Sequence, residues 1–159
     1  MFMELRAFLK TLPAFEGFSD AYVDALANSF SVGSYETGHT FINQGSEGEA
    51  LYLIVNGGVR VIHRDEITQR DQEMKELRSG EMFGLLSLLT DMPALATCIA
   101  VEPVTAASLP RTAFEKLAHS APPINNHLLY MVAVQLARDL QDRNRSLRTL
   151  LKQAAVAKS

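Results

Sequence analysis

The chain has 159 residues and a mass of 17.5 kDa, which suits one globular domain with a hydrophobic core. Its 18 Asp and Glu residues outnumber its 15 Lys and Arg residues, which argues against a generally basic nucleic-acid-binding protein. A single cysteine excludes an internal disulfide and a multi-cysteine metal site. No apolar run approaches the roughly 20 residues of a membrane span, and the first residues lack the pattern of a signal peptide. We therefore expect a cytoplasmic protein that does not contact the membrane.

The charge is unevenly distributed along the chain. Residues 1–137 carry 16 acidic and 9 basic side chains, a balance of −7, whereas residues 138–159 carry 6 basic and 2 acidic ones, a balance of +4. Basic residues near the end of a helix complement its dipole. The same basic end is also a candidate surface for a protein partner.

The first 30 residues are predicted to form helices. Apolar residues recur at helical spacing between Leu5 and Leu12, and Pro13 ends that stretch. Ser19 is suited to cap a second short helix.

Residues 31–109 have the pattern of many short β-strands. The run 51–55 is rich in β-forming residues and is followed by Asn56-Gly57-Gly58. Asn-Gly between two apolar runs predicts a β-hairpin, whose return strand begins at Val59.

Further segments belong to this β region, with short strands predicted at Phe41-Ile42 and from Met74 to Leu77. The polar run 64–72 predicts a solvated hairpin tip, and 97–101 and 104–109 predict two more strands. Many short strands at this spacing favour a β-barrel or jelly roll.

Residues 110–153 are predicted to be helical, and 154–159 to form a tail. Pro110 suits the start of one helix, and Pro122-Pro123 is expected to break the chain before a long helix over 124–153. Its leucines lie close to heptad spacing, and no other local element is available to cover the second half of the helix. We therefore expect a homodimer that pairs through this helix. The leucines of the predicted dimer seam are Leu129, Leu136, Leu140 and Leu147.

Two segments carry a family resemblance. Residues 44–61 read QGSEGEALYLIVNGGVRV, and residues 77–84 read LRSGEMFG. In this order and spacing they resemble the cyclic nucleotide-binding domain family, the sensor domain of the catabolite activator protein and of protein kinase A regulatory subunits. The resemblance implies a mainly β fold with flanking helices. Its centre would be a double-stranded β-helix, or jelly-roll, barrel over residues 31–109, with N-terminal helices over 1–30 and a long C-terminal dimerisation helix within 110–153.

The resemblance also places a phosphate-binding cassette after Gly80. In the family, a glutamate in this cassette accepts a hydrogen bond from the ribose 2′-hydroxyl, and an arginine pairs with the cyclic phosphate. Leu85 stands where the glutamate is expected and Ala94 where the arginine is expected. The residues that the resemblance assigns to the degenerate cassette are Phe83, Gly84, Leu85, Leu86, Ser87, Pro93, Ala94, Leu95, Ala96 and Thr97. Arg143 and Asn144 correspond to family residues that cap the nucleobase.

The two replacements predict weak binding of ordinary cyclic nucleotides. Loss of one charge-assisted pair costs roughly 1.5–3 kcal/mol, and an unpaired buried charge costs more. We therefore expect a regulatory or sensor module that does not bind cyclic AMP or cyclic GMP in the usual way. Three alternatives stay open: a ligand-free dimerisation or docking module, a cavity for a less charged or apolar effector, and weak or rearranged nucleotide binding. Neither Arg78 nor Arg111 falls at the family position of the missing arginine.

Other functional classes find little support. His39, His63, His119 and His127 are scattered, so neither a metal site nor a catalytic group of residues is predicted, and no cofactor is expected. Cys98 lies in an apolar run and is predicted to be a small core residue. Transcription factors of the family carry a DNA-binding domain after the long helix. We expect a standalone module without one, and hence no direct DNA binding.

Overall fold

The computed structural model describes residues 4–158, so residues 1–3 of the predicted helical segment and Ser159 of the predicted tail lie outside it. The chain divides into two compact units, residues 1–125 and residues 126–159. The first unit contains the N-terminal helices, a β-barrel, a short helix α3 (Leu85–Leu89) and the helix α4 (Arg111–Ser120). The second consists of the long helix α5 (Pro122–Lys158) from residue 126 onward.

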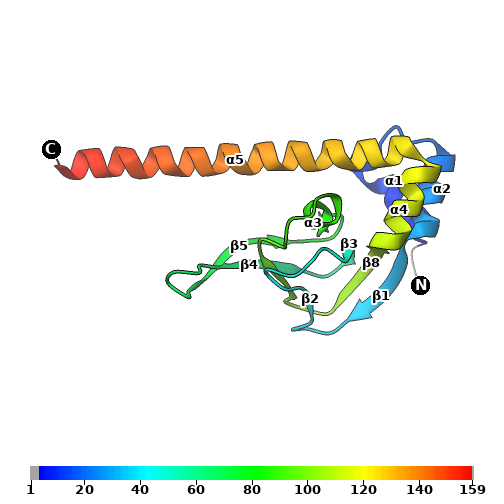
Figure 1. The fold of residues 1–159 in the computed structure, drawn as a ribbon, viewed down its shortest axis with the longest axis horizontal. Coiled ribbons are helices and arrows are strands. Elements are labelled where there is room, and N and C mark those ends of the chain that lie inside the picture. Colours follow the sequence, from blue (N-terminus) through cyan, green and yellow to red (C-terminus); the bar gives the residue numbers. More distant parts are fainter. Residues whose placement is uncertain (1–3, 159) are drawn as a thin grey trace. The chain divides into compact units, whose positions relative to one another are not determined.

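The N-terminal segment is helical, as the sequence predicts. It consists of α1 (Leu5–Thr11), a 3-10 turn (Pro13–Phe15) and α2 (Asp20–Ser29). The Ser19 hydroxyl oxygen accepts a hydrogen bond from the Tyr22 amide at 3.2 Å, which confirms the predicted helix cap. Figure 1 shows α1, α2 and α4 gathered at the end of the barrel from which β1 and β8 extend.

Within the described residues, eight strands form two four-stranded antiparallel sheets with the orders β1-β8-β3-β6 and β2-β7-β4-β5. Buried side chains from both sheets meet between them, Ile54 and Val104 from the first and Val59 and Ala100 from the second. This shared core makes the two sheets one barrel, the jelly roll that the sequence predicts. The strands are β1 (Ser31–Tyr35), β2 (Thr40–Ile42), β3 (Ala50–Asn56), β4 (Val59–Arg64), β5 (Asp71–Leu77), β6 (Met82–Phe83), β7 (Thr97–Ala100) and β8 (Val104–Pro110).

The predicted hairpin at Asn56-Gly57-Gly58 is wrong. β3 pairs with β6 and β8, whereas β4 pairs with β5 and β7, so this turn carries the chain from one sheet to the other. Gly57 has a φ of +106°, and a Cβ there would lie 2.5 Å from the Pro103 carbonyl oxygen. Asn56 keeps a negative φ, so the turn lacks the two positive φ angles of a type I′ hairpin.

The solvated hairpin tip lies where the sequence predicts it, between β4 and β5. The Asp65 carboxylate accepts hydrogen bonds from the Thr68 and Ile67 amides, which lower the pKa of Asp65. Ile67 is 92% exposed at this tip. In Figure 1 the β4–β5 hairpin projects from the barrel.

Helix α5 is longer at both ends than the sequence predicts. It begins at Pro122, because proline is tolerated in the first turn, where amide groups lack intrahelical partners. It continues through residues 154–158, which were predicted to be a tail, because alanine is the strongest helix former. No helix in the described part of the chain is long and apolar enough to cross a membrane.

Candidate ligand-binding site

The short helix α3 forms one side of the candidate site. Gly84 precedes it with a φ of +88°, and a Cβ at this position would lie 2.7 Å from the Ala50 carbonyl oxygen. Glycine is therefore required both for the backbone conformation and for the close approach of β3. Leu85, the first residue of α3, is buried, so an apolar side chain occupies the position where the family resemblance expects a glutamate.

Ala94 is the second altered cassette position. Its side chain is buried, its amide donates to the Ser46 carbonyl oxygen at 2.9 Å, and its carbonyl oxygen accepts from the Gly45 amide at 2.8 Å. These two bonds hold residue 94 against the loop between β2 and β3. An arginine here would bring its guanidinium into that neighbourhood, whereas alanine brings only a methyl group.

The other predicted cassette residues have different environments. Phe83 belongs to the barrel core, and the Thr97 hydroxyl oxygen accepts from the Gln44 amide at 2.9 Å. Pro93 and Leu95 are exposed, while Leu86 and Ala96 are half-buried. Gly84 and Ser87 are the two cassette residues that line a cavity.

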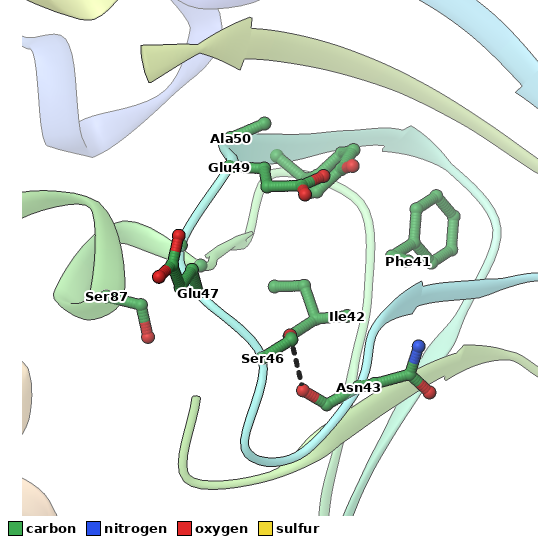
Figure 2. Close-up of a pocket in the computed structure, with 11 residues that line it drawn as sticks. Phe41, Ile42, Asn43, Ser46, Glu47, Glu49, Ala50 and Ser87 are labelled. Carbon is green, nitrogen blue, oxygen red and sulfur yellow. Dashed lines mark hydrogen bonds between the residues drawn. The ribbon is translucent and has the colours of Figure 1, made fainter. Parts of the chain in front are cut away.

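This cavity lies between α3 and the loop that joins β2 to β3. Its volume of about 130 Å³ is many times the roughly 10–15 Å³ that one water molecule needs, so the barrel is not packed solid here. Figure 2 shows the Glu49 side chain extending toward Phe41, and Glu47 on the side of Ser87. The lining residues are Phe41, Ile42, Asn43, Ser46, Glu47, Gly48, Glu49, Ala50, Tyr52, Gly84 and Ser87.

The cavity is acidic. Two carboxylates line it, those of Glu47 and Glu49, and no Lys or Arg is among its lining residues. Burial raises the pKa of Tyr52, with further contributions from Tyr35 and from the charge of Glu49. An anionic phosphate in this cavity would therefore face like charges instead of the expected arginine.

Arg111, at the start of α4, has its guanidinium bound by backbone carbonyl groups. Its guanidinium donates to the carbonyl oxygens of Gly48 (2.7 and 3.1 Å), Ser87 (3.2 Å) and Leu88 (3.3 Å). The Arg111 amide also donates to the Glu49 carbonyl oxygen at 2.9 Å. Arg111 thus ties the β2–β3 loop to α3 and does not line the cavity.

Arg78 forms ion pairs at the surface. It pairs with Glu76 at 2.8 Å and with Glu102 at 3.0 Å. Neither Arg78 nor Arg111 replaces the missing cassette arginine.

Gly48 fixes the loop against α3. A Cβ on Gly48 would overlap the backbone carbonyl group of Ser87. The absence of a side chain therefore allows the two segments to touch, with Glu47 and Glu49 on either side of the contact. Sequence reasoning did not find these two acids. Residues 43–49 form no strand, so the sequence carried no periodic signal that these two side chains line a cavity.

The remaining candidate residues do not form a site. Cys98 is buried in β7, and burial raises the pKa of its thiol to about 11, as expected for a core residue. Among residues 4–158 no group of three or more His, Cys, Asp and Glu side chains is placed to hold a metal ion. Arg143 and Asn144 are exposed on α5, and their role as a cap over a ligand stays a prediction.

Comparison with known proteins decides the family. The family model for the cyclic nucleotide-binding domain matches residues 32–121. The chain belongs to this family. A cGMP-dependent protein kinase of Eimeria tenella is 30% identical to the chain over 116 residues, which are 73% of this chain and 11% of the kinase.

Two solved structures resemble the chain over most of its length. The Thermus thermophilus catabolite activator protein superposes with a TM-score of 0.72 at 30% identity, over 87% of this chain and 62% of that one. The regulatory subunit of a cAMP-independent protein kinase A from Trypanosoma cruzi, bound to guanosine, superposes with a TM-score of 0.65 at 27% identity. That match covers 82% of this chain and 48% of the regulatory subunit. The chain thus spans about half to two thirds of these relatives and about a tenth of the kinase.

Proposed function

We propose that this domain is a non-enzymatic regulatory module that does not bind cyclic AMP or cyclic GMP in the usual way of its family. The observation that carries the proposal is the replacement of both ligand-specific groups by buried apolar side chains, Leu85 and Ala94. The two carboxylates of the cavity, those of Glu47 and Glu49, add repulsion toward a cyclic phosphate.

The cavity favours a sensor over a module that never binds a ligand. Although Leu85 is buried, a cavity of about 130 Å³ lies beside α3 and leaves space for a small ligand. The Trypanosoma cruzi relative is described as cAMP-independent and bound to guanosine, a ligand without a phosphate. That description supports a ligand other than a cyclic nucleotide for this chain.

Calorimetric titration with cyclic AMP and cyclic GMP tests the proposal. The unmodified chain should show no binding at micromolar concentration. The double variant Leu85→Glu, Ala94→Arg should bind cyclic AMP roughly 10- to 100-fold more tightly than the unmodified chain, because it restores a charge-assisted pair and a hydrogen bond. Leu95→Arg is the matched control, since it places the same charge at an exposed neighbouring position. Micromolar binding of cyclic AMP by the unmodified chain would contradict the proposal.

We also infer that the chain forms a homodimer through the second half of α5. Leu136 is 47% exposed, Leu140 60% and Leu147 55%, and they lie at the predicted heptad spacing. Exposed leucines in a continuous stripe lower the free energy of the chain when a second copy covers them.

Light scattering tests the dimer. The unmodified chain should have twice the chain mass of 17.5 kDa, and Leu140→Asp should have the chain mass itself. Gln141→Asp introduces the same charge next to the stripe and should stay dimeric. A monomer at high concentration for the unmodified chain would rule the dimer out.

The basic end of α5 stays a candidate surface for a protein partner. Arg138, Arg145 and Lys152 are exposed there at intervals of seven residues, which places them along one line of the helix. It also stays a prediction that this domain works without a DNA-binding domain.

A further inference from the structure

We propose that the cavity beside α3 binds a small organic cation, an amine or quaternary ammonium compound. This inference rests on the proposed function, because it names the ligand class of the same cavity. Three features of the cavity carry it: two carboxylates without a cationic partner, a wall of aromatic rings, and a rigid backbone beneath both.

The carboxylates of Glu47 and Glu49 lack a cation within the structure. Neither forms an ion pair among residues 4–158, although both line the cavity. The family resemblance places an arginine at position 94, whose backbone is hydrogen-bonded to Gly45 and Ser46 in the same loop. Glu47 and Glu49 are exposed, and alanine at position 94 adds no charge beside them. The Arg111 guanidinium is bound to the Gly48 carbonyl oxygen and forms no ion pair with either carboxylate. A cationic ligand would supply what the missing arginine does not.

The aromatic wall favours an organic cation over a metal ion. Phe41 and Tyr52 line the cavity with ring centroids 5.2 Å apart and an interplanar angle of 67°. Phe83 stacks on Tyr52 at 5.1 Å and contacts Phe41 at 5.4 Å, so a third ring packs against both. Ring faces attract ammonium groups that have apolar substituents, whereas a hard metal ion seeks a full set of oxygen ligands.

The backbone that holds the two carboxylates is fixed. Arg111 binds the Gly48 and Glu49 carbonyl oxygens, and Gly48 touches the Ser87 backbone. The backbone that carries the two exposed glutamate side chains is therefore held in place before a ligand arrives, which lowers the entropy lost on binding.

Titration with putrescine, a diamine, is the direct test, and 1,4-butanediol is its neutral counterpart of similar shape. Putrescine or choline should bind at millimolar concentration or below and raise the midpoint of thermal unfolding, while butanediol should do neither. Added salt should weaken binding of the amine, because the attraction depends on charge. Equal binding of putrescine and butanediol would overturn the inference, as would the absence of binding by both amines.

Three variants connect the effect to the cavity. Glu47→Gln and Glu49→Gln keep the shape of the side chain and remove its charge, and each should weaken amine binding at least about tenfold. Glu66→Gln removes the same charge from the exposed hairpin tip and should leave binding unchanged. Amine binding that is equal in all three variants would place the cation elsewhere and overturn the inference.

Three other titrations separate this inference from the proposed function. Saturable binding of Ca²⁺ alone that blocks putrescine would overturn the organic-cation inference in favour of a metal. A second outcome is that guanosine binds, that Glu47→Gln and Glu49→Gln leave its binding unchanged, and that neither amine binds. This result would overturn the organic-cation inference but support a ligand other than a cyclic nucleotide. Micromolar cyclic AMP binding would overturn the proposed function itself.

Discussion

Leucine has opposite roles in the two units of the chain. In the barrel, Leu51, Leu53 and Leu109 are fully buried. In α5, Leu147 and Leu150 are 55% and 61% exposed. The barrel therefore buries its apolar residues, whereas these leucines of the helix are exposed. The first set packs the barrel core, and the second set is the one that the proposed dimer would cover.

The largest expected effect is on the free energy of unfolding, when leucine is replaced by alanine in the barrel instead of in α5. Leu53→Ala should lower the free energy of unfolding by about 2–5 kcal/mol, because it leaves a cavity in the barrel core. Leu147→Ala should change barrel unfolding by less than about 0.5 kcal/mol. Urea denaturation followed by near-ultraviolet circular dichroism measures both.

Protein concentration provides the control for this pair. The effect of Leu53→Ala should be the same at every concentration, whereas Leu147→Ala should raise the concentration at which the chain associates. Equal losses in barrel stability for the two variants would erase the distinction between the units.

A smaller effect tests how tightly the barrel is packed at the candidate site. Gly48→Ala should cost about 1–3 kcal/mol, because the added methyl group overlaps the Ser87 backbone. Thermal or urea unfolding measures the cost. Gly45→Ala, which has a positive φ but no atom within 4 Å of the new Cβ, should cost only about 1 kcal/mol. A neutral Gly48→Ala variant would mean that the loop separates from α3 without penalty.

Cys98 provides a pH-dependent test of the barrel interior. Its thiol pKa is raised to about 11, two units above its ordinary value of 9.0, so alkylation at pH 8 should be about 100-fold slower than in the unfolded chain. The native state keeps this proton up to about pH 11, whereas the unfolded chain releases it near pH 9. Stability should therefore fall between these pH values, and it should fall less in Cys98→Ala. Rapid alkylation of the native chain would show an open interior.

The smallest expected effect concerns an exposed residue that needs no partner. Ile67→Ser at the hairpin tip should change the free energy of unfolding by less than about 0.5 kcal/mol and leave association unchanged, since Ile67 is 92% exposed and isolated. Unfolding and light-scattering measurements check both. A loss of association here would place part of the interface on the hairpin instead of on α5.

Sequence patterns predicted best those features of the fold that depend only on residues close together in the sequence. Ser19 as a helix cap and 64–72 as a solvated tip follow from local chemistry, and the structure has both. The Asn56-Gly57 hairpin was wrong because a turn sequence does not specify which strand a segment pairs with. That choice depends on β8, about 50 residues later in the chain.

The candidate site was predictable only in part. The cassette order predicted where α3 begins, because Gly84 needs its positive φ. The acidic cavity was not predicted, because its lining comes from two strands, a loop and α3, which only the folded chain brings together.

The central place of β8 sets the order of events on the ribosome. In its sheet β8 lies between β1 and β3, with Val32 opposite Ala107 on one side and Leu53 opposite Ala107 on the other. Until residues 104–110 have left the exit tunnel, β1 and β3 have no strand between them, and both expose unpaired backbone groups. During synthesis the nascent chain is therefore most vulnerable to mispairing before β8 emerges, and slowing translation just before that point should increase its dependence on chaperones.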